Sequence, residues 1–207
     1  MKRFLKLFPC IILITVMVLF TFSACTQDEP ETIEVDGFKY TIIQDKDGSS
    51  EYYAKLIKYV GDADHVTVPA EVYSEKLDQN LKVTSIGGLA FYNLPVKNVI
   101  LSEGTKRVEN FSFGYSQIMR VEIPSTIEYI GDWSFVNCKA LREVSIKAEK
   151  SPKLGVYAFK YYDDDSRDYE INPKLRIEVP SLSAYKTTDV FNNWREYQDN
   201  LVEVHND

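Results

Sequence analysis

Few residues of this sequence have a type and spacing suited to covalent or metal chemistry. His65 and His205 are the two histidines, and neither stands in the sequence context of a zinc site or of a catalytic base. The chain has no phosphate-cradling glycine loop, no Gly-x-Ser-x-Gly elbow and no His-Glu-x-x-His motif. We interpret both histidines as solvated and predict a protein that is not an enzyme and needs no metal or cofactor.

The acidic segment 163–168 is the remaining candidate for an ion site. It reads Asp-Asp-Asp-Ser-Arg-Asp, and clustered carboxylates are ligands that calcium prefers. The segment lacks the glycine and the final glutamate of a calcium-binding loop. We favour a solvated insertion, with calcium binding as the alternative.

Charge and composition narrow the choice of partners. Hydrophobic residues make up 44% of the chain and charged residues 27%, enough for a packed core. The 24 basic residues, less the three in the first 24 positions, leave 21 against 31 acidic residues, a net charge of −10. A surface with this negative charge repels phosphate backbones and anionic headgroups. We therefore expect neither a nucleic-acid partner nor electrostatic membrane docking.

The N-terminus has the order of a secretory signal. A basic start is followed by an apolar stretch at 7–22 and then by Phe22-Ser23-Ala24-Cys25. This last sequence resembles a lipobox, in which Leu is usual at the position of Phe22. The resemblance implies a signal peptide at 1–24 and acyl chains on Cys25 that anchor the protein in the membrane. A plain transmembrane helix is the alternative, since such a helix needs roughly 20 apolar residues.

An acidic run follows Cys25. It resembles signals that send some lipoproteins to the outer cell surface, while a solvated tether over 25–35 is the alternative. We expect a protein lipid-anchored in the outer membrane and facing the cell exterior. With Cys25 modified, Cys138 has no partner for a disulfide, so stability must come from packing.

The middle of the chain repeats about every 22 residues. A small residue followed by Phe recurs with spacings of 22, 22 and 24, and an aliphatic residue stands five positions before each Phe. A unit this short cannot bury its apolar face alone, so the copies must stack, with the four Phe residues as the structural core. The four pairs are Ala90-Phe91, Ser112-Phe113, Ser134-Phe135 and Ala158-Phe159.

Residues 123–141 carry a specific resemblance. They are similar to the BspA-type leucine-rich repeat of bacterial surface lipoproteins, and the similarity extends over roughly 36–205. It implies a β-rich repeat solenoid, a leucine-rich-repeat-like right-handed superhelix of about five coils. It also places Cys138 at the cysteine position of the repeat, as a buried packing thiol. Ser102 and Lys147 depart from the pattern, which has proline after the strand.

The ends of the repeat array are predicted to be caps. We assign 36–65 to an N-terminal β-hairpin cap, 66–174 to the coils, and 175–207 to the last coil and a C-terminal cap of helix and strand. A cap protects the open edge of the first coil, which would otherwise pair with other chains.

Alternation in the repeat strands predicts a candidate binding face. Side chains that flank an inward Val must point outward, which gives two columns of exposed residues. The columns are His65, Asn98, Arg120, Glu143 and Arg176, and Thr67, Ile100, Glu122, Ser145 and Glu178. If the strands pair in parallel, Arg120 lies beside Glu143 and Glu143 beside Arg176, which predicts a ladder of ion pairs. A solvated face that only avoids like-charge repulsion is the alternative, and tyrosines after the Phe column are a second candidate surface.

The resemblance implies binding of host or matrix proteins. We therefore expect a monomeric, lipid-anchored, adhesin-like interaction module whose ligand is a host or matrix protein or a glycan. The alternative is a structural or accessory subunit of a surface complex for glycan capture or assembly.

Overall fold

The computed structural model describes residues 31–44, 51–187 and 192–204. The chain divides into two units, residues 1–31 and 32–207, and the architecture below is that of the second. The predicted signal segment, Cys25 and His205 lie outside the described residues. The protein is strand-rich with little helix. Among the described residues, no helix is long and apolar enough to cross a membrane.

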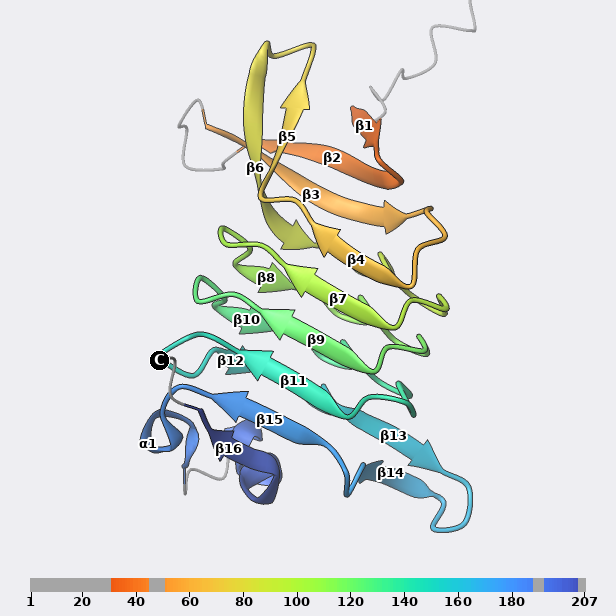
Figure 1. Ribbon diagram of the computed structural model, residues 1–207, viewed down its shortest axis with the longest axis vertical. Coiled ribbons are helices and arrows are strands. Elements are labelled where there is room, and N and C mark those ends of the chain that lie inside the picture. Colours follow the sequence, from red (N-terminus) through yellow and green to blue (C-terminus); the bar gives the residue numbers. More distant parts are fainter. Residues whose placement is uncertain (1–30, 45–50, 188–191, 205–207) are drawn as a thin grey trace, which may run out of the picture. The chain divides into compact units, whose positions relative to one another are not determined.

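One strand of each repeat contributes to a six-stranded parallel sheet, here called sheet B (Figure 1). Each strand alternates between buried β-branched or Leu residues and outward residues, which are polar except for Ile100 and Val202. This is the pattern of a half-buried strand. Val121 and Ile123 of one strand, for example, are fully buried, while Arg120, whose side chain points to the opposite side of that strand, is exposed. The strands are β4 (His65–Val68), β7 (Asn98–Leu101), β9 (Arg120–Ile123), β11 (Glu143–Ile146), β15 (Arg176–Val179) and β16 (Leu201–Glu203).

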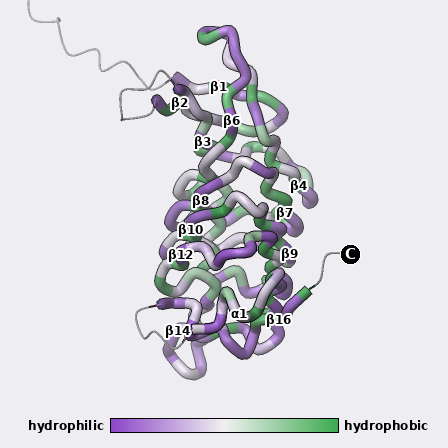
Figure 2. The backbone as a smooth tube through the Cα atoms, turned by 90° about the vertical axis from the view of Figure 1, so that its left-hand side faces the viewer, coloured by the Kyte–Doolittle hydropathy of each residue, from purple (hydrophilic) through white to green (hydrophobic). Residues whose placement is uncertain are grey.

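A second, shorter strand of each repeat joins sheet A. Figure 2 shows sheets A and B on opposite sides of the stacked repeats. The inward residue of each short strand, such as Val108 or Ile130, has no exposed surface. The strands of sheet A that pair in parallel are β3 (Tyr52–Tyr59), β6 (Gln79–Ile86), β8 (Arg107–Val108), β10 (Tyr129–Ile130) and β12 (Lys153–Leu154).

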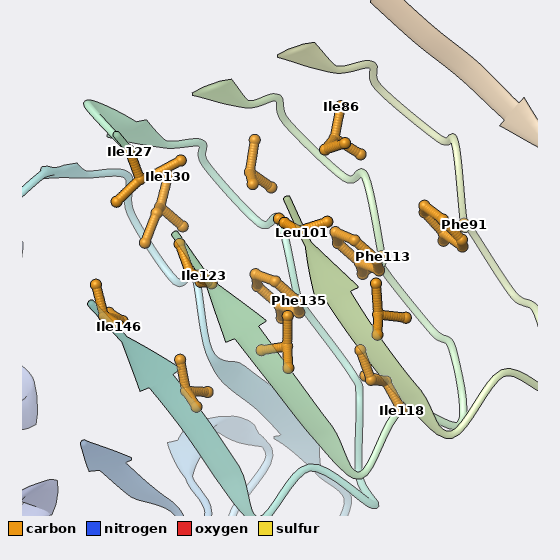
Figure 3. Packing of buried hydrophobic residues seen from close by; sticks show 14 of the residues in the cluster. Ile86, Phe91, Leu101, Phe113, Ile118, Ile123, Ile127, Ile130, Phe135 and Ile146 are labelled. Carbon is orange, nitrogen blue, oxygen red and sulfur yellow. The ribbon is translucent and has the colours of Figure 1, made fainter. Parts of the chain in front are cut away.

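The predicted Phe residues form one stacked column between the two sheets (Figure 3). Ring centroids lie 4.8 Å apart for Phe91 and Phe113, 4.7 Å for Phe113 and Phe135, and 5.3 Å for Phe135 and Phe159. All four side chains are buried. Stacked rings at this separation both fill the core and attract each other.

Backbone hydrogen bonds explain why a small residue precedes each Phe. The N–H of Phe113 donates to the carbonyl of Ser134 at 2.8 Å, and the N–H of Phe135 donates to the carbonyl of Ala158 at 2.8 Å. The two backbones therefore approach closely at these positions. Gly131 marks a second close approach, since a Cβ there would lie 2.6 Å from Asn110 Oδ1 and 2.7 Å from its backbone N.

A three-stranded antiparallel ribbon begins the described chain: β1 (Thr32–Val35), β2 (Phe38–Gln44) and β3. Residues 32–35, at the end of the stretch for which a solvated tether is one alternative, form a strand paired with β2. The reason is the Asp36-Gly37 turn, whose φ angles of 50° and 79° suit a tight hairpin. Beyond it, Tyr59 stacks on Phe91 at 5.4 Å and extends the aromatic column.

Two hairpins interrupt the regular repeats. The first pairs β5 (Glu71–Ser74) with the start of β6. The second pairs β13 (Lys160–Asp163) with β14 (Asp168–Ile171). In the second hairpin, residues 164–168 are exposed, as expected of a solvated insertion. Tyr162 and Tyr169, which flank the acidic segment, are half-buried because they pack on each other and Tyr169 packs on Trp133.

Two short helical segments follow β15, namely α1 (Leu182–Tyr185) and the 3-10 helix η1 (Asn193–Asn200). Trp194 in η1 is buried, and its Nε1 donates to the carbonyl of Pro152 at 2.7 Å. β16 then pairs in parallel with β15. The strand ends at Glu203.

Candidate functional site

The outer face of sheet B brings all the predicted binding residues together. The register pairs Asn98 with Arg120, Arg120 with Glu143, and Glu143 with Arg176. It likewise pairs Ile100 with Glu122 and Glu122 with Ser145. Both columns therefore run straight across adjacent strands, as the alternation predicted.

Ion pairs connect the charged residues of this face. Arg120 Nη2 lies 3.2 Å from Glu143 Oε1 and 3.4 Å from Glu122 Oε1. Lys147 Nζ lies 3.6 Å from the other Glu122 oxygen. These side chains keep much of their surface in water, so each pair contributes about 0–1 kcal/mol. Such weakly held charges are readily available to a partner.

Arg176 has a different partner from the predicted one. The sequence suggested a cross-strand pair with Glu143, but Arg176 Nε bonds Glu178 Oε1 at 3.0 Å. Residues two apart in a strand share a face, so this partner on the same strand is equally within reach.

The rest of the face is uncharged. At one end of the first column, Asn98 Nδ2 lies 2.7 Å from His65 Nδ1. In the second column, Ile100 is 40% exposed, a large apolar side chain in a polar surrounding. The chemistry open to this arrangement is non-covalent: ion pairs and hydrogen bonds around an apolar spot.

Cys138 is placed as a packing thiol. The side chain is buried, with Sγ 3.1 Å from the carbonyl of Phe113 and 3.4 Å from Ser116 Oγ. Desolvation by burial raises the pKa of the thiol to about 12, so the thiol stays protonated and unreactive at neutral pH.

Asp163 in the acidic segment holds a turn. Its Oδ1 accepts hydrogen bonds from the backbone N–H groups of Asp165 at 2.9 Å and Ser166 at 3.0 Å. The bond from Ser166 is the main cause that lowers the pKa of this carboxyl. Within the described ranges, no group of three or more His, Cys, Asp or Glu side chains is arranged to hold a metal ion.

A pocket of about 600 Å³ lies away from the predicted face. The sequence drew attention to two of its residues, Tyr115 and Tyr162, as tyrosines after the Phe column. Tyr169 went unnoticed, because nothing in its local pattern shows that β14 folds back onto the repeats. The pocket is lined by Tyr115, Asn137, Lys139, Tyr162 and Tyr169.

Two strands per repeat and a buried aromatic column are typical of a leucine-rich-repeat-like fold. Residues 71–176 match the BspA type leucine-rich repeat region, in six copies. The chain belongs to this family. The expected resemblance is thereby confirmed, as is the strand-rich, leucine-rich-repeat-like fold.

Solved structures of leucine-rich repeat proteins are similar to this BspA-type chain. One from Bacteroides capillosus has 22% identity and a TM-score of 0.46, covering 84% of this chain and 98% of that one. One from Bacteroides ovatus has 20% identity and a TM-score of 0.47, covering 71% and 37%. The pneumococcal vaccine antigen PcpA has 15% identity and a TM-score of 0.40, covering 72% and 50%. No curated protein matches the sequence.

Proposed function

We propose that this BspA-type protein is a lipid-anchored, adhesin-like module that binds a protein partner with the outer face of sheet B. One observation carries the proposal: five strands in register leave two columns of outward side chains open to solvent. The family points the same way, since leucine-rich-repeat proteins are generally non-enzymatic binding modules.

The repeats supply the extended surface that such binding requires. In our proposal they wind as a right-handed solenoid of about five coils, so that each coil adds one strand to the face. Solenoids of this kind present several side chains in a line to one partner. Cys25 attaches the module to the outer membrane, facing the cell exterior.

The side chains on the outer face of sheet B determine which groups a protein partner must present. Arg120 and Glu143 offer charges of opposite sign, and Ile100 offers an apolar contact nearby. A partner that fits carries both charges around a small apolar side chain. Complementary charges increase the rate and the specificity of association more than the affinity itself.

A charge exchange tests the proposal. The double variant Arg120→Glu/Glu143→Arg keeps one cation beside one anion but reverses the pattern that a partner meets. The full-length chain, purified in detergent, is measured against immobilised extracellular-matrix proteins. The exchange also brings like charges next to Glu122 and Arg176, so the melting temperature should fall by at most about 4 °C. We expect at least a tenfold weaker affinity for any ligand of the wild type.

Lys106→Glu/Glu128→Lys is the matched control. This pair is 3.7 Å apart and exposed, and both residues precede strands of sheet A rather than sheet B. Its exchange should leave binding unchanged. Equal binding by both double variants and the wild type would remove sheet B from the interface. Co-purification with membrane neighbours, without binding by the purified chain, would favour an accessory subunit.

A further inference from the structure

The pocket between the repeats and the β13–β14 hairpin combines aromatic rings with polar groups. The repeats contribute Tyr115, Asn137 and Lys139, and the β13–β14 hairpin contributes Tyr162 and Tyr169. Every one of these five side chains carries a polar atom. A volume of about 600 Å³ is within the usual range of small-molecule sites.

The hairpin is fixed rigidly to the repeats by an aromatic cluster. Tyr169 packs edge-on against Trp133 at 4.9 Å and stacks on Tyr157 at 5.2 Å, while Tyr162 meets Tyr169 at 5.3 Å. Asn137 Oδ1 also accepts a hydrogen bond from the backbone N–H of Tyr162 at 2.6 Å. The insertion therefore forms a preorganised wall of the pocket.

The backbone conformation at Tyr115 is a second feature that points to a binding role for this residue. Asn93, Tyr115 and Asn137 stand at equivalent positions of successive repeats, with φ of 56°, 62° and 56°. Asn tolerates this left-handed region far better than a bulky aromatic residue does. Tyr115 occupies the position although it is bulky, and it packs on Tyr92 with ring centroids 5.4 Å apart. The residue is still 46% exposed, which leaves part of its surface open to a ligand.

We propose that this pocket binds a neutral saccharide. The C–H faces of a pyranose ring pack on tyrosine rings, and its hydroxyls pair with the phenols and with the Asn137 amide. An aliphatic or aromatic peptide side chain would leave these polar groups without partners, which is unfavourable in a binding site.

The charged groups around the pocket favour a neutral saccharide over an acidic one. Lys139 is the one cation among the lining residues, and its Nζ lies 3.8 Å from Asp164 Oδ2, which balances it. Asp163 and Asp165 on the same hairpin add negative charge at its tip. An acidic saccharide would be repelled by these carboxylates. Desolvation and the neighbouring tyrosines raise the pKa of Tyr169, which keeps its phenol neutral.

Tyr115→Asn tests the site without endangering the fold. It restores the residue that the neighbouring repeats use at this φ, so the melting temperature should hold or rise. The full-length chain in a polyoxyethylene detergent is run through native gels that contain laminarin, mannan, xyloglucan or arabinoxylan. We expect at least one polysaccharide to retard the wild type, and Tyr115→Asn and Tyr169→Ala to weaken this binding at least tenfold.

Tyr73→Ala is the matched control, since Tyr73 is 50% exposed on β5 and does not line the pocket. It should be retarded like the wild type. Retardation of Tyr115→Asn equal to the wild type would overturn the proposal, as would a wild type that no polysaccharide retards. Loss of protein binding instead of saccharide binding in Tyr115→Asn would assign the pocket to a protein partner and also overturn it. The site is separate from sheet B, so either proposal can fail alone.

Discussion

The hydroxyl of Tyr197 accepts a hydrogen bond from the backbone N–H of Phe159, with 3.2 Å between the two atoms. In earlier repeats the equivalent N–H donates to a carbonyl of the next repeat, as Phe135 does to Ala158. At Phe159 this carbonyl acceptor is replaced by the phenol of η1. The ring of Tyr197 also meets Phe159 edge-on at 5.6 Å and so closes the aromatic column.

Removing this hydroxyl should destabilise the protein. Tyr197→Phe keeps the ring but leaves the buried N–H of Phe159 without an acceptor, and such a loss costs about 1–3 kcal/mol. Urea denaturation of both proteins measures it. Tyr73→Phe, at an exposed tyrosine, should stay within about 0.5 kcal/mol of the wild type. If the two variants are equally stable, the phenol does not cap the repeat array.

The Phe column should dominate stability. Phe135 is stacked between Phe113 and Phe159 and is 1% exposed, so Phe135→Ala should lower the free energy of unfolding by about 3–5 kcal/mol. Glu122→Ala removes only exposed ion pairs and should cost at most about 1 kcal/mol. Chemical denaturation that ranks the two variants the other way would contradict the assigned core.

The repeat core was predictable because its signal is periodic. Columns such as Phe91, Phe113 and Phe135 hold one spacing, and stacking is the one way in which such short units bury them. Alternation then fixed which strand residues point outward, including Arg120 and Glu143.

Features that depend on single contacts were not predictable. Thr32–Val35 reads as the end of an acidic tether until the turn at Asp36 returns the chain along it. The pocket unites Tyr115 with Tyr169, which lie in different repeats and share no periodic position. Arg176 has Glu143 on the neighbouring strand and Glu178 on its own strand as candidate partners, and it bonds Glu178. Sequence spacing alone does not show which of the two it binds.

Alkaline pH should weaken the fold. Burial raises the pKa of Cys138 from 9.0 to about 12 and also raises the pKa of Tyr185 and Tyr197. The folded chain thus keeps protons that the unfolded chain releases. The stability that the thiol contributes is complete below pH 9.0 and is lost as the pH rises toward about 12.

Cys138→Ala should therefore show a shallower loss of stability with pH. We expect its free energy of unfolding to decline less between about pH 9 and 10 than that of the wild type, as followed by urea titrations at each pH. Parallel declines in the two proteins would mean that the thiol is not buried in the folded state.

The anchor has its own test. Because Phe22-Ser23-Ala24-Cys25 resembles a lipobox, cells fed a labelled fatty acid should incorporate it into the wild type and not into Cys25→Ala. The wild type should also partition into detergent. Equal labelling of both proteins would rule out acylation at Cys25.

Adherence of whole cells to an immobilised matrix protein tests the central claim, a surface-anchored module that binds through sheet B. Cells carry the wild type, Cys25→Ala, or Arg120→Glu/Glu143→Arg, with surface amounts measured by antibody. We predict adherence with the wild type, and its loss both with Cys25→Ala, which is not retained, and with the charge exchange at an unchanged surface amount. Full adherence of cells that carry the charge exchange would contradict the account.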